Sequence, residues 1–235
     1  MQFSTWSPPP SYGDGKAQQE ELWAAFDQKR AARILMLPAL FEEANALRRF
    51  TFSLMRSLDE AGIDSALPDW PGCHESLASL SAQTLSRWQA CVQKAADHFK
   101  ATHIFAIRGG ALLDQTDLPG WHYAPVEGAK LLSGMLRAQA IAEREAGRTE
   151  TREALLERAR QEGIILAGWP IGAEMVRELE ATTPVQSSAK TVIDQVDMVG
   201  GGLWLRAEPG EDPRQTVALS KIVGDAVGPD KTSDP

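Results

Sequence analysis

The stretch Thr102–Leu113, THIFAIRGGALL, decides the fold. Its residues His103–Ile107 are mostly apolar, and isoleucine and phenylalanine favour strands. Gly109 and Gly110 follow and predict a sharp turn, because glycine adopts backbone conformations that other residues avoid. After the turn, Ala111–Leu113 are apolar residues that are compatible with a helix. We therefore expect a short buried strand that ends at Ile107, a tight turn, and the first turn of a helix.

Length and charge limit the class of protein. A chain of 235 residues can form one large α/β domain or two small ones, and its 43% hydrophobic content is ordinary for a globular protein. The net charge of -8 argues against a binder of nucleic acid or anionic membranes. The longest apolar run, Ile34–Phe41, is far shorter than the roughly 20 residues of a membrane span. We expect neither a nucleic-acid partner nor a membrane span.

Cysteines, histidines and glycines offer no sign of a metal or cofactor. Cys73 and Cys91 have neither CxxC nor zinc-site spacing, and the four histidines lack an HxxxH pattern. The sequence also contains no GxGxxG or Walker A motif. The first fifteen residues do not resemble a secretory signal. We therefore predict no cofactor and no metal, and a reducing cytoplasmic location.

Short apolar segments alternate with amphipathic segments along the chain. This alternation predicts an α/β fold with a mostly parallel sheet and helices on both faces. The expected strands are Arg33–Leu40, Ile63–Leu67, His103–Ile107, Trp121–Val126, Ile164–Ala167 and Leu203–Arg206. The expected helices are Gln18–Arg30, Phe41–Ala61, Ser81–Lys100, Glu127–Ala146, Thr151–Gln161, Ile171–Ala181 and Arg214–Val223.

We divide the chain into three parts. Residues 1–17 contain three consecutive prolines and are predicted to form an irregular N-terminal arm. Residues 18–226 are predicted to form a single α/β domain, and residues 227–235 a polar C-terminal tail. Within the domain, Pro119-Gly120 should cut short any helix that follows Gly110.

Five segments in order resemble one family. They are Leu37–Phe50, Leu67–Ser76, Phe105–Leu113, Tyr123–Gln139 and Leu166–Glu180. Together they are similar to the α/β-hydrolase-like proteins called exosortase A system-associated hydrolases, whose genes lie near bacterial exopolysaccharide and PEP-CTERM sorting genes. The resemblance implies a truncated α/β-hydrolase-like fold.

The resemblance also implies where a nucleophile would stand. In such a fold the motif small-x-Ser-x-Gly forms a strand–turn–helix elbow that presents the serine hydroxyl. The matching residues here are Ala106–Gly110, so Arg108 holds the nucleophile position. A guanidinium stays protonated and cannot attack a carbonyl.

The rest of a serine-hydrolase triad is incomplete as well. A histidine must follow the acid along the chain, and the candidate acid is Asp212. The histidines are His74, His98, His103 and His122, and none of them follows Asp212. We expect no standard triad and assign no catalytic residue. Cys73 and His74 are a possible substitute pair, but sequence neighbours often point apart, which favours a structural role for them.

A ligand site is expected where three loops meet. In an open α/β sheet, ligands bind outside the carboxyl ends of the strands. The loops Pro38–Asn45, Pro68–Ser76 and Arg108–Leu112 should converge there. Their candidate pocket residues are Glu42, Glu43, Asn45, Asp69, Cys73, His74, Arg108, Gly109 and Gly110.

Two roles for Arg108 follow. As a plug, it would pair with Glu43 or Asp69 inside the old active site, because a buried guanidinium needs a partner. As a clamp, it would bind an anionic ligand together with backbone N–H groups. The acidic loops favour the plug.

We therefore predict a catalytically inactive binding or scaffold module, linked to exopolysaccharide production or PEP-CTERM protein sorting. Its partner would be a small anionic ligand or another protein. The alternative is a hydrolase with a non-standard active site, acting on an ester or on an anionic glycan or lipid-linked substrate.

Overall fold

The computed structural model describes residues 1–10, 20–206 and 208–228. Within these residues, seven strands form a central sheet in the order β1-β2-β4-β3-β5-β6-β9. The strands are β1 (Gln2–Trp6), β2 (Glu21–Phe26), β3 (Arg33–Leu37), β4 (Asp64–Pro68), β5 (His103–Ile107), β6 (Gly120–Tyr123) and β9 (Lys190–Ile193). Strand β2 runs antiparallel to β1 and β4, and the pairs from β4 to β9 are parallel.

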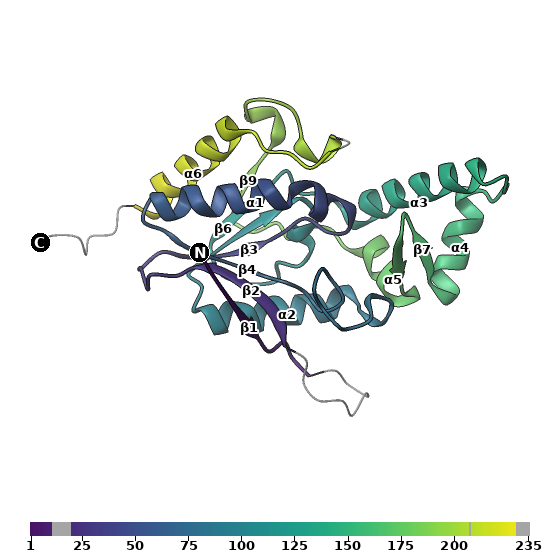
Figure 1. Cartoon of the computed structure of the whole chain (residues 1–235), viewed down its shortest axis with the longest axis horizontal. Coiled ribbons are helices and arrows are strands. Elements are labelled where there is room, and N and C mark those ends of the chain that lie inside the picture. The colour runs from purple at the N-terminus through teal and green to yellow at the C-terminus, as the bar shows by residue number, and fades with distance from the viewer. Residues whose placement is uncertain (11–19, 207, 229–235) are drawn as a thin grey trace, which may run out of the picture.

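Helices cover both faces of this sheet, as Figure 1 shows. Helices α1 (Glu42–Glu60) and α6 (Pro213–Val227) lie together on one face, and α2 (Leu85–Phe99) lies on the other. The inner stripe of α2, which includes Trp88, Val92 and Phe99, is buried against the sheet. Two apolar clusters result, one on each side of the sheet. The predicted α/β architecture with a mostly parallel sheet and helices on both faces is confirmed.

An inserted segment separates β6 from β9. It contains α3 (Gly128–Glu145), α4 (Arg152–Glu162), the antiparallel pair β7 (Ile164–Leu166) and β8 (Trp169–Ile171), and α5 (Ala173–Ala181). We call residues 128–181 the cap. Figure 1 shows it gathered at one end of the molecule, beside the central sheet.

The parallel register brings the predicted loops to one edge. Ala106 of β5 pairs with Leu37 of β3 on one side and with His122 of β6 on the other. The segments that follow these strands therefore start at the same carboxyl edge. Short 3₁₀ turns occupy much of that edge, namely η1 (Leu80–Ala82), η2 (Arg108–Leu112), η3 (Gln195–Asp197) and η4 (Leu203–Leu205).

The N-terminal predictions were wrong. Residues 1–17 are not simply an irregular arm, because Gln2–Trp6 form the edge strand β1, and the helix expected at Gln18–Arg30 is replaced by β2. The apolar residues of β2 are buried on both faces, so their order lacks the alternation that identifies a half-exposed strand. Residues 11–17 of the predicted arm lie outside the described residues.

The C-terminal predictions need three corrections. The strand expected at Leu203–Arg206 is the 3₁₀ turn η4. The last strand of the sheet is instead β9, at residues where neither a strand nor a helix was expected. The expected tail begins inside α6, which continues to Val227. Residues 229–235 of that tail lie outside the described residues. Of the helices in the described part of the chain, none is long and apolar enough to cross a membrane.

Candidate active site

The turn after β5 has the conformation of an elbow. Strand β5 ends at Ile107 as predicted. Arg108 follows with a φ of 54°, in the left-handed region that residues other than glycine rarely adopt. Gly110 lies so close to the end of β3 that an added Cβ would stand 2.4 Å from the Leu37 carbonyl oxygen. Only glycine fits there. The expected helix is reduced to the turn η2, so Arg108 stands at the head of the elbow.

The Arg108 guanidinium is held on several sides. Its Nε and Nη2 donate to the two carboxylate oxygens of Glu43, at 3.1 and 2.8 Å. Its Nη1 donates to the carbonyl oxygen of Ala124 at 3.0 Å. Its Cζ lies 4.1 Å from the centre of the Trp204 ring, a cation–π geometry. Arg108 therefore links α1, the elbow, the end of β6 and η4.

Of the two carboxylates considered for Arg108, Glu43 is the partner. It stands in the first turn of α1, and both side chains are largely buried, with 14% and 18% exposed. A bidentate arginine–carboxylate pair is the strongest common form of charge-assisted hydrogen bonding. The sequence did not predict the contacts of Arg108 with Trp204 and with the Ala124 carbonyl. Ala124 follows the end of β6, and Trp204 follows β9, a strand that was not predicted.

Asp69 belongs to a separate cluster. Its Oδ1 lies 3.0 Å from Nδ1 of His74 and 3.6 Å from Nη1 of Arg48. His74 has a positive φ of 47°, so its backbone is strained in the loop after β4. This arrangement is an aspartate–histidine pair, in which the carboxylate orients the imidazole.

A narrow cavity separates this pair from the cap. It is lined by Pro38, Ala39, Leu40, Phe41, Ala44, Pro68, Trp70, Cys73, His74 and Trp169. Its volume is about 10 Å³, which is room for about one water molecule. Trp169 of the cap stands edge-on to Phe41 with ring centres 6.0 Å apart, so the cap closes over the loop that follows β3.

The surroundings of Cys73 suppress its thiolate form. Burial, with smaller contributions from the charges of Asp69 and Glu21, raises the pKa of its thiol to about 12. The thiolate is the reactive form, so this thiol is inert near neutral pH. The structure thus supports the structural role favoured for Cys73 over catalysis by a Cys73–His74 pair.

We expect iodoacetamide at pH 8 to alkylate Cys73 more than about 100-fold more slowly than free cysteine, because almost no thiolate is present. Mass spectrometry of timed digests measures the rate. The same protein in urea should react at an ordinary rate at both cysteines. Rapid labelling of Cys73 in the folded protein would contradict this description of the site.

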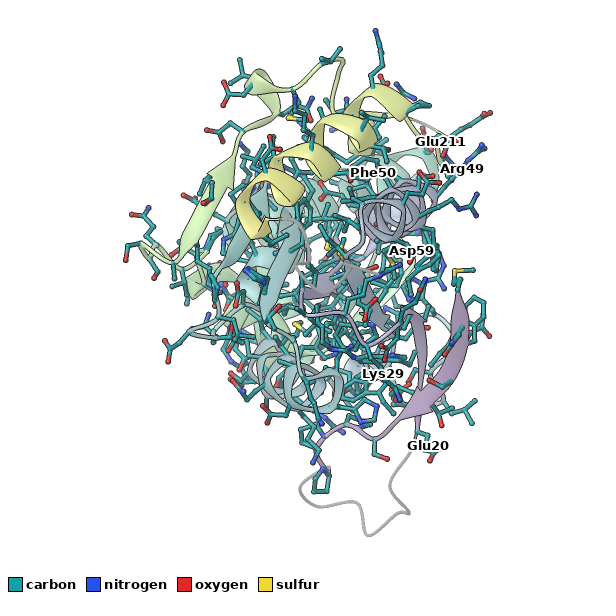
Figure 2. All side chains as sticks on the ribbon, turned by 90° about the vertical axis from the view of Figure 1, so that its left-hand side faces the viewer. Glu20, Lys29, Arg49, Phe50, Asp59 and Glu211 are labelled. Carbon is teal, nitrogen blue, oxygen red and sulfur yellow. The ribbon has the colours of Figure 1, made fainter. Side chains whose placement is uncertain are left out.

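The remaining candidates lie outside this centre. Glu42 and Asn45 are exposed on the first turn of α1. Asp212 caps α6, where its carboxylate accepts the backbone N–H and the side chain of Arg214. Arg49 of α1 forms an ion pair with Glu211 at 2.6 Å. Both side chains are labelled in Figure 2.

A buried ionic cluster was not anticipated from the sequence. Asp114 and His122 are both fully buried, and Oδ2 of Asp114 lies 2.8 Å from Nε2 of His122 and 2.7 Å from Nζ of Lys190. Thr116 donates to the other oxygen of Asp114 through its backbone and its hydroxyl. The cluster joins the loop after η2 to β6 and β9. One sequence feature could have indicated it. Lys190 precedes the β-branched run Thr191–Ile193, which forms β9, but that run was not predicted to be a strand.

Comparison with known structures identifies the fold. The chain is similar to a variant of AqdC in complex with its substrate, the Pseudomonas quinolone signal, at 12% identity over 96% of this chain and 97% of that one, with a TM-score of 0.53. It is also similar to the ferulic acid-bound Est1E from Butyrivibrio proteoclasticus, at 11% identity over 88% and 94% of the two chains, with a TM-score of 0.52. A malate-bound thermophilic esterase from Thermogutta terrifontis matches 97% of this chain with 98% of its own, at 10% identity and a TM-score of 0.51. The chain has the α/β-hydrolase fold.

No family model and no curated protein matches the sequence. At identities of 10–12%, these structures establish the architecture alone. The turn after β5 carries Arg108 at its head, and what this chain does must be argued from its own residues.

Proposed function

We propose that this chain is a catalytically inactive α/β-hydrolase-fold protein that acts as a binding or scaffold module. The observation that carries the proposal is the Arg108–Glu43 pair at the head of the elbow. An arginine there supplies no nucleophile, and its bidentate pairing with Glu43 holds the guanidinium within the protein.

The geometry favours the plug over the anion clamp. All three guanidinium nitrogens of Arg108 already donate within the protein, and Glu43 neutralises the charge. An incoming carboxylate or phosphate would have to displace Glu43 and would meet its negative charge. The elbow is therefore a structural joint, and the module binds a protein partner rather than an anion at this position.

The proposal includes a cellular role for this module. Resemblance to the exosortase A system-associated hydrolases suggests a role in exopolysaccharide production or PEP-CTERM protein sorting, within the cytoplasm. Affinity capture of the full chain from its native host should recover a reproducible partner, and failure to recover one would count against the scaffold role.

A hydrolase with a non-standard site is the second candidate. The Asp69–His74 pair beside a water-sized cavity is the specific observation that favours it. An imidazole oriented by a carboxylate could act as a general base on a water molecule. Hydrolysis of p-nitrophenyl esters that is lost in His74→Gln and kept in Arg108→Ala would establish this candidate over the inactive module.

Restoring the serine should not restore hydrolysis. We expect Arg108→Ser to leave p-nitrophenyl acetate turnover and fluorophosphonate labelling at the level of the wild type, because no histidine follows Asp212 to complete the standard triad and take the serine proton. Labelling is read by intact mass. Stoichiometric labelling of Ser at position 108 would overturn the conclusion that the whole triad is lost.

A further inference from the structure

The loop that follows β4 has little regular structure of its own. It spans residues 69–79, between the end of β4 and the turn η1, and we call it the β4 loop. Its backbone forms two turns, in which the N–H of Cys73 donates to the Trp70 carbonyl and the N–H of Ser76 donates to the Cys73 carbonyl. Trp70, Cys73 and His74 also line the narrow cavity that faces the cap. The contacts that hold this loop closed therefore set the width of that cavity.

The Ser76 side chain fastens the loop from inside. Its hydroxyl oxygen accepts the backbone N–H of Gly72 at 2.8 Å and the backbone N–H of Ala78 at 3.1 Å. The same hydroxyl donates its proton to Oε1 of Glu21 at 2.9 Å. Because Glu21 is the first residue of β2, this last bond ties the β4 loop to the central sheet.

Glu21 places a carboxyl group in a buried position. The residue is 1% exposed, and Trp6, its register partner on β1, is 2% exposed. Within the described part of the chain, Oε2 of Glu21 has no hydrogen-bond partner, and neither has Oδ2 of Asp69 in the β4 loop. A buried carboxylate with an unpaired oxygen is costly, whereas a protonated carboxyl group carries no net charge to solvate. This position therefore favours the protonated form of Glu21.

The charges around Glu21 do not offset its burial. Burial raises the pKa of Glu21, the hydrogen bond from Ser76 lowers it, the charge of Asp69 raises it and the charge of Arg87 lowers it. The resulting pKa lies above the ordinary value for glutamate. The titratable and charged groups of the elements packed against Glu21 are Asp69 and Cys73 of the β4 loop and Arg87 and Cys91 of α2.

Opening of the β4 loop would hydrate this carboxyl group, and a hydrated glutamate ionises at its ordinary pKa. The closed loop therefore holds the proton more tightly than the open loop does. By linkage, the advantage of the closed form is fully present below the ordinary value of 4.5 and is lost as pH rises through the pKa of the closed form. We infer that Glu21 is a pH-sensitive anchor, which holds the β4 loop closed through Ser76 when protonated and releases it when ionised. Release widens the cavity that faces the cap. This anchor does not depend on the proposed scaffold role.

Amide hydrogen exchange of the full chain tests the anchor, measured by NMR between about pH 5 and pH 8. After correction for intrinsic exchange rates, protection of Gly72 and Ala78 should fall at least about threefold over this range in the wild type. In Glu21→Gln, which stays neutral, their protection should be constant. Glu20→Gln alters the exposed carboxylate one position earlier and should behave like the wild type. The same loss of protection in Glu21→Gln as in the wild type would overturn the inference.

Two measurements on the wild type keep the inference testable if a variant fails to fold. In a ¹³C NMR titration, the side-chain carboxyl carbon of Glu21 should have a midpoint above 4.5, and a midpoint at or below that value would contradict the anchor. Amides of β5 should also exchange more slowly than those of Gly72 and Ala78. Equal protection at the two places would show that the loop opens only when the whole domain unfolds, which would likewise overturn the inference.

Discussion

Asp114→Asn should lower the free energy of unfolding by about 3–5 kcal/mol, the cost typical of breaking a buried ion pair. The substitution keeps the shape of the side chain but leaves the Lys190 ammonium without its counter-charge in a site with 2% of that side chain exposed. It also replaces one of the two acceptor oxygens, which serve His122, Lys190 and Thr116, with an NH2 group that can only donate. Urea denaturation followed by circular dichroism measures the loss.

Two comparisons make this prediction specific. Glu174→Gln removes an exposed partner of Arg177 and should change stability by less than about 1 kcal/mol. In Asp114→Asn/Lys190→Met, part of the lost stability should return, because the second change removes the uncompensated charge. A loss below about 1 kcal/mol in Asp114→Asn would show that the cluster is not a structural joint.

The same carboxylate predicts a dependence on pH. Burial alone raises the pKa of Asp114, but hydrogen bonds from His122 and Lys190 outweigh it and hold that pKa below its usual value. A lowered pKa contributes stability that is present above the unfolded value near 4 and is lost as pH falls through the folded value. Wild-type stability should therefore fall more steeply below about pH 4 than that of Asp114→Asn.

Glu43→Gln should destabilise the protein by about 2–3 kcal/mol, somewhat less than a fully buried pair because Arg108 and Glu43 keep some exposure. The change leaves the guanidinium charged beneath Trp204. Since Arg108 joins four elements, local protection of η4 against hydrogen exchange should fall as well. Urea denaturation and amide exchange give the two readouts.

The paired variant separates the plug from the clamp. Arg108→Met/Glu43→Gln should recover stability relative to Glu43→Gln, because an apolar side chain can pack under Trp204 without needing a counter-charge. Wild-type protein should show no saturable binding of inorganic phosphate at the elbow. Undiminished stability in Glu43→Gln, together with phosphate binding that Arg108→Ala abolishes, would favour the clamp.

Local sequence was enough to predict the elbow. Residues 103–107 are apolar and β-favouring, and Gly109 and Gly110 permit the close turn, so β5 and the position of Arg108 follow from short-range chemistry. The arginine at position 108 and the lack of a histidine after Asp212 are likewise properties of the sequence. The alternation of strands and helices was sufficient to predict the α/β class.

Long-range packing decided the rest. Strands β2 and β9 are defined by their neighbours, because short strands at or near the edges of the sheet carry little periodic signal of their own. Their placement brings Trp204 over Arg108 and Lys190 against Asp114. Each of these contacts joins residues more than seventy positions apart. The sequence by itself therefore determined which residue stands at the head of the elbow, and only the tertiary structure decided what holds that residue in its place.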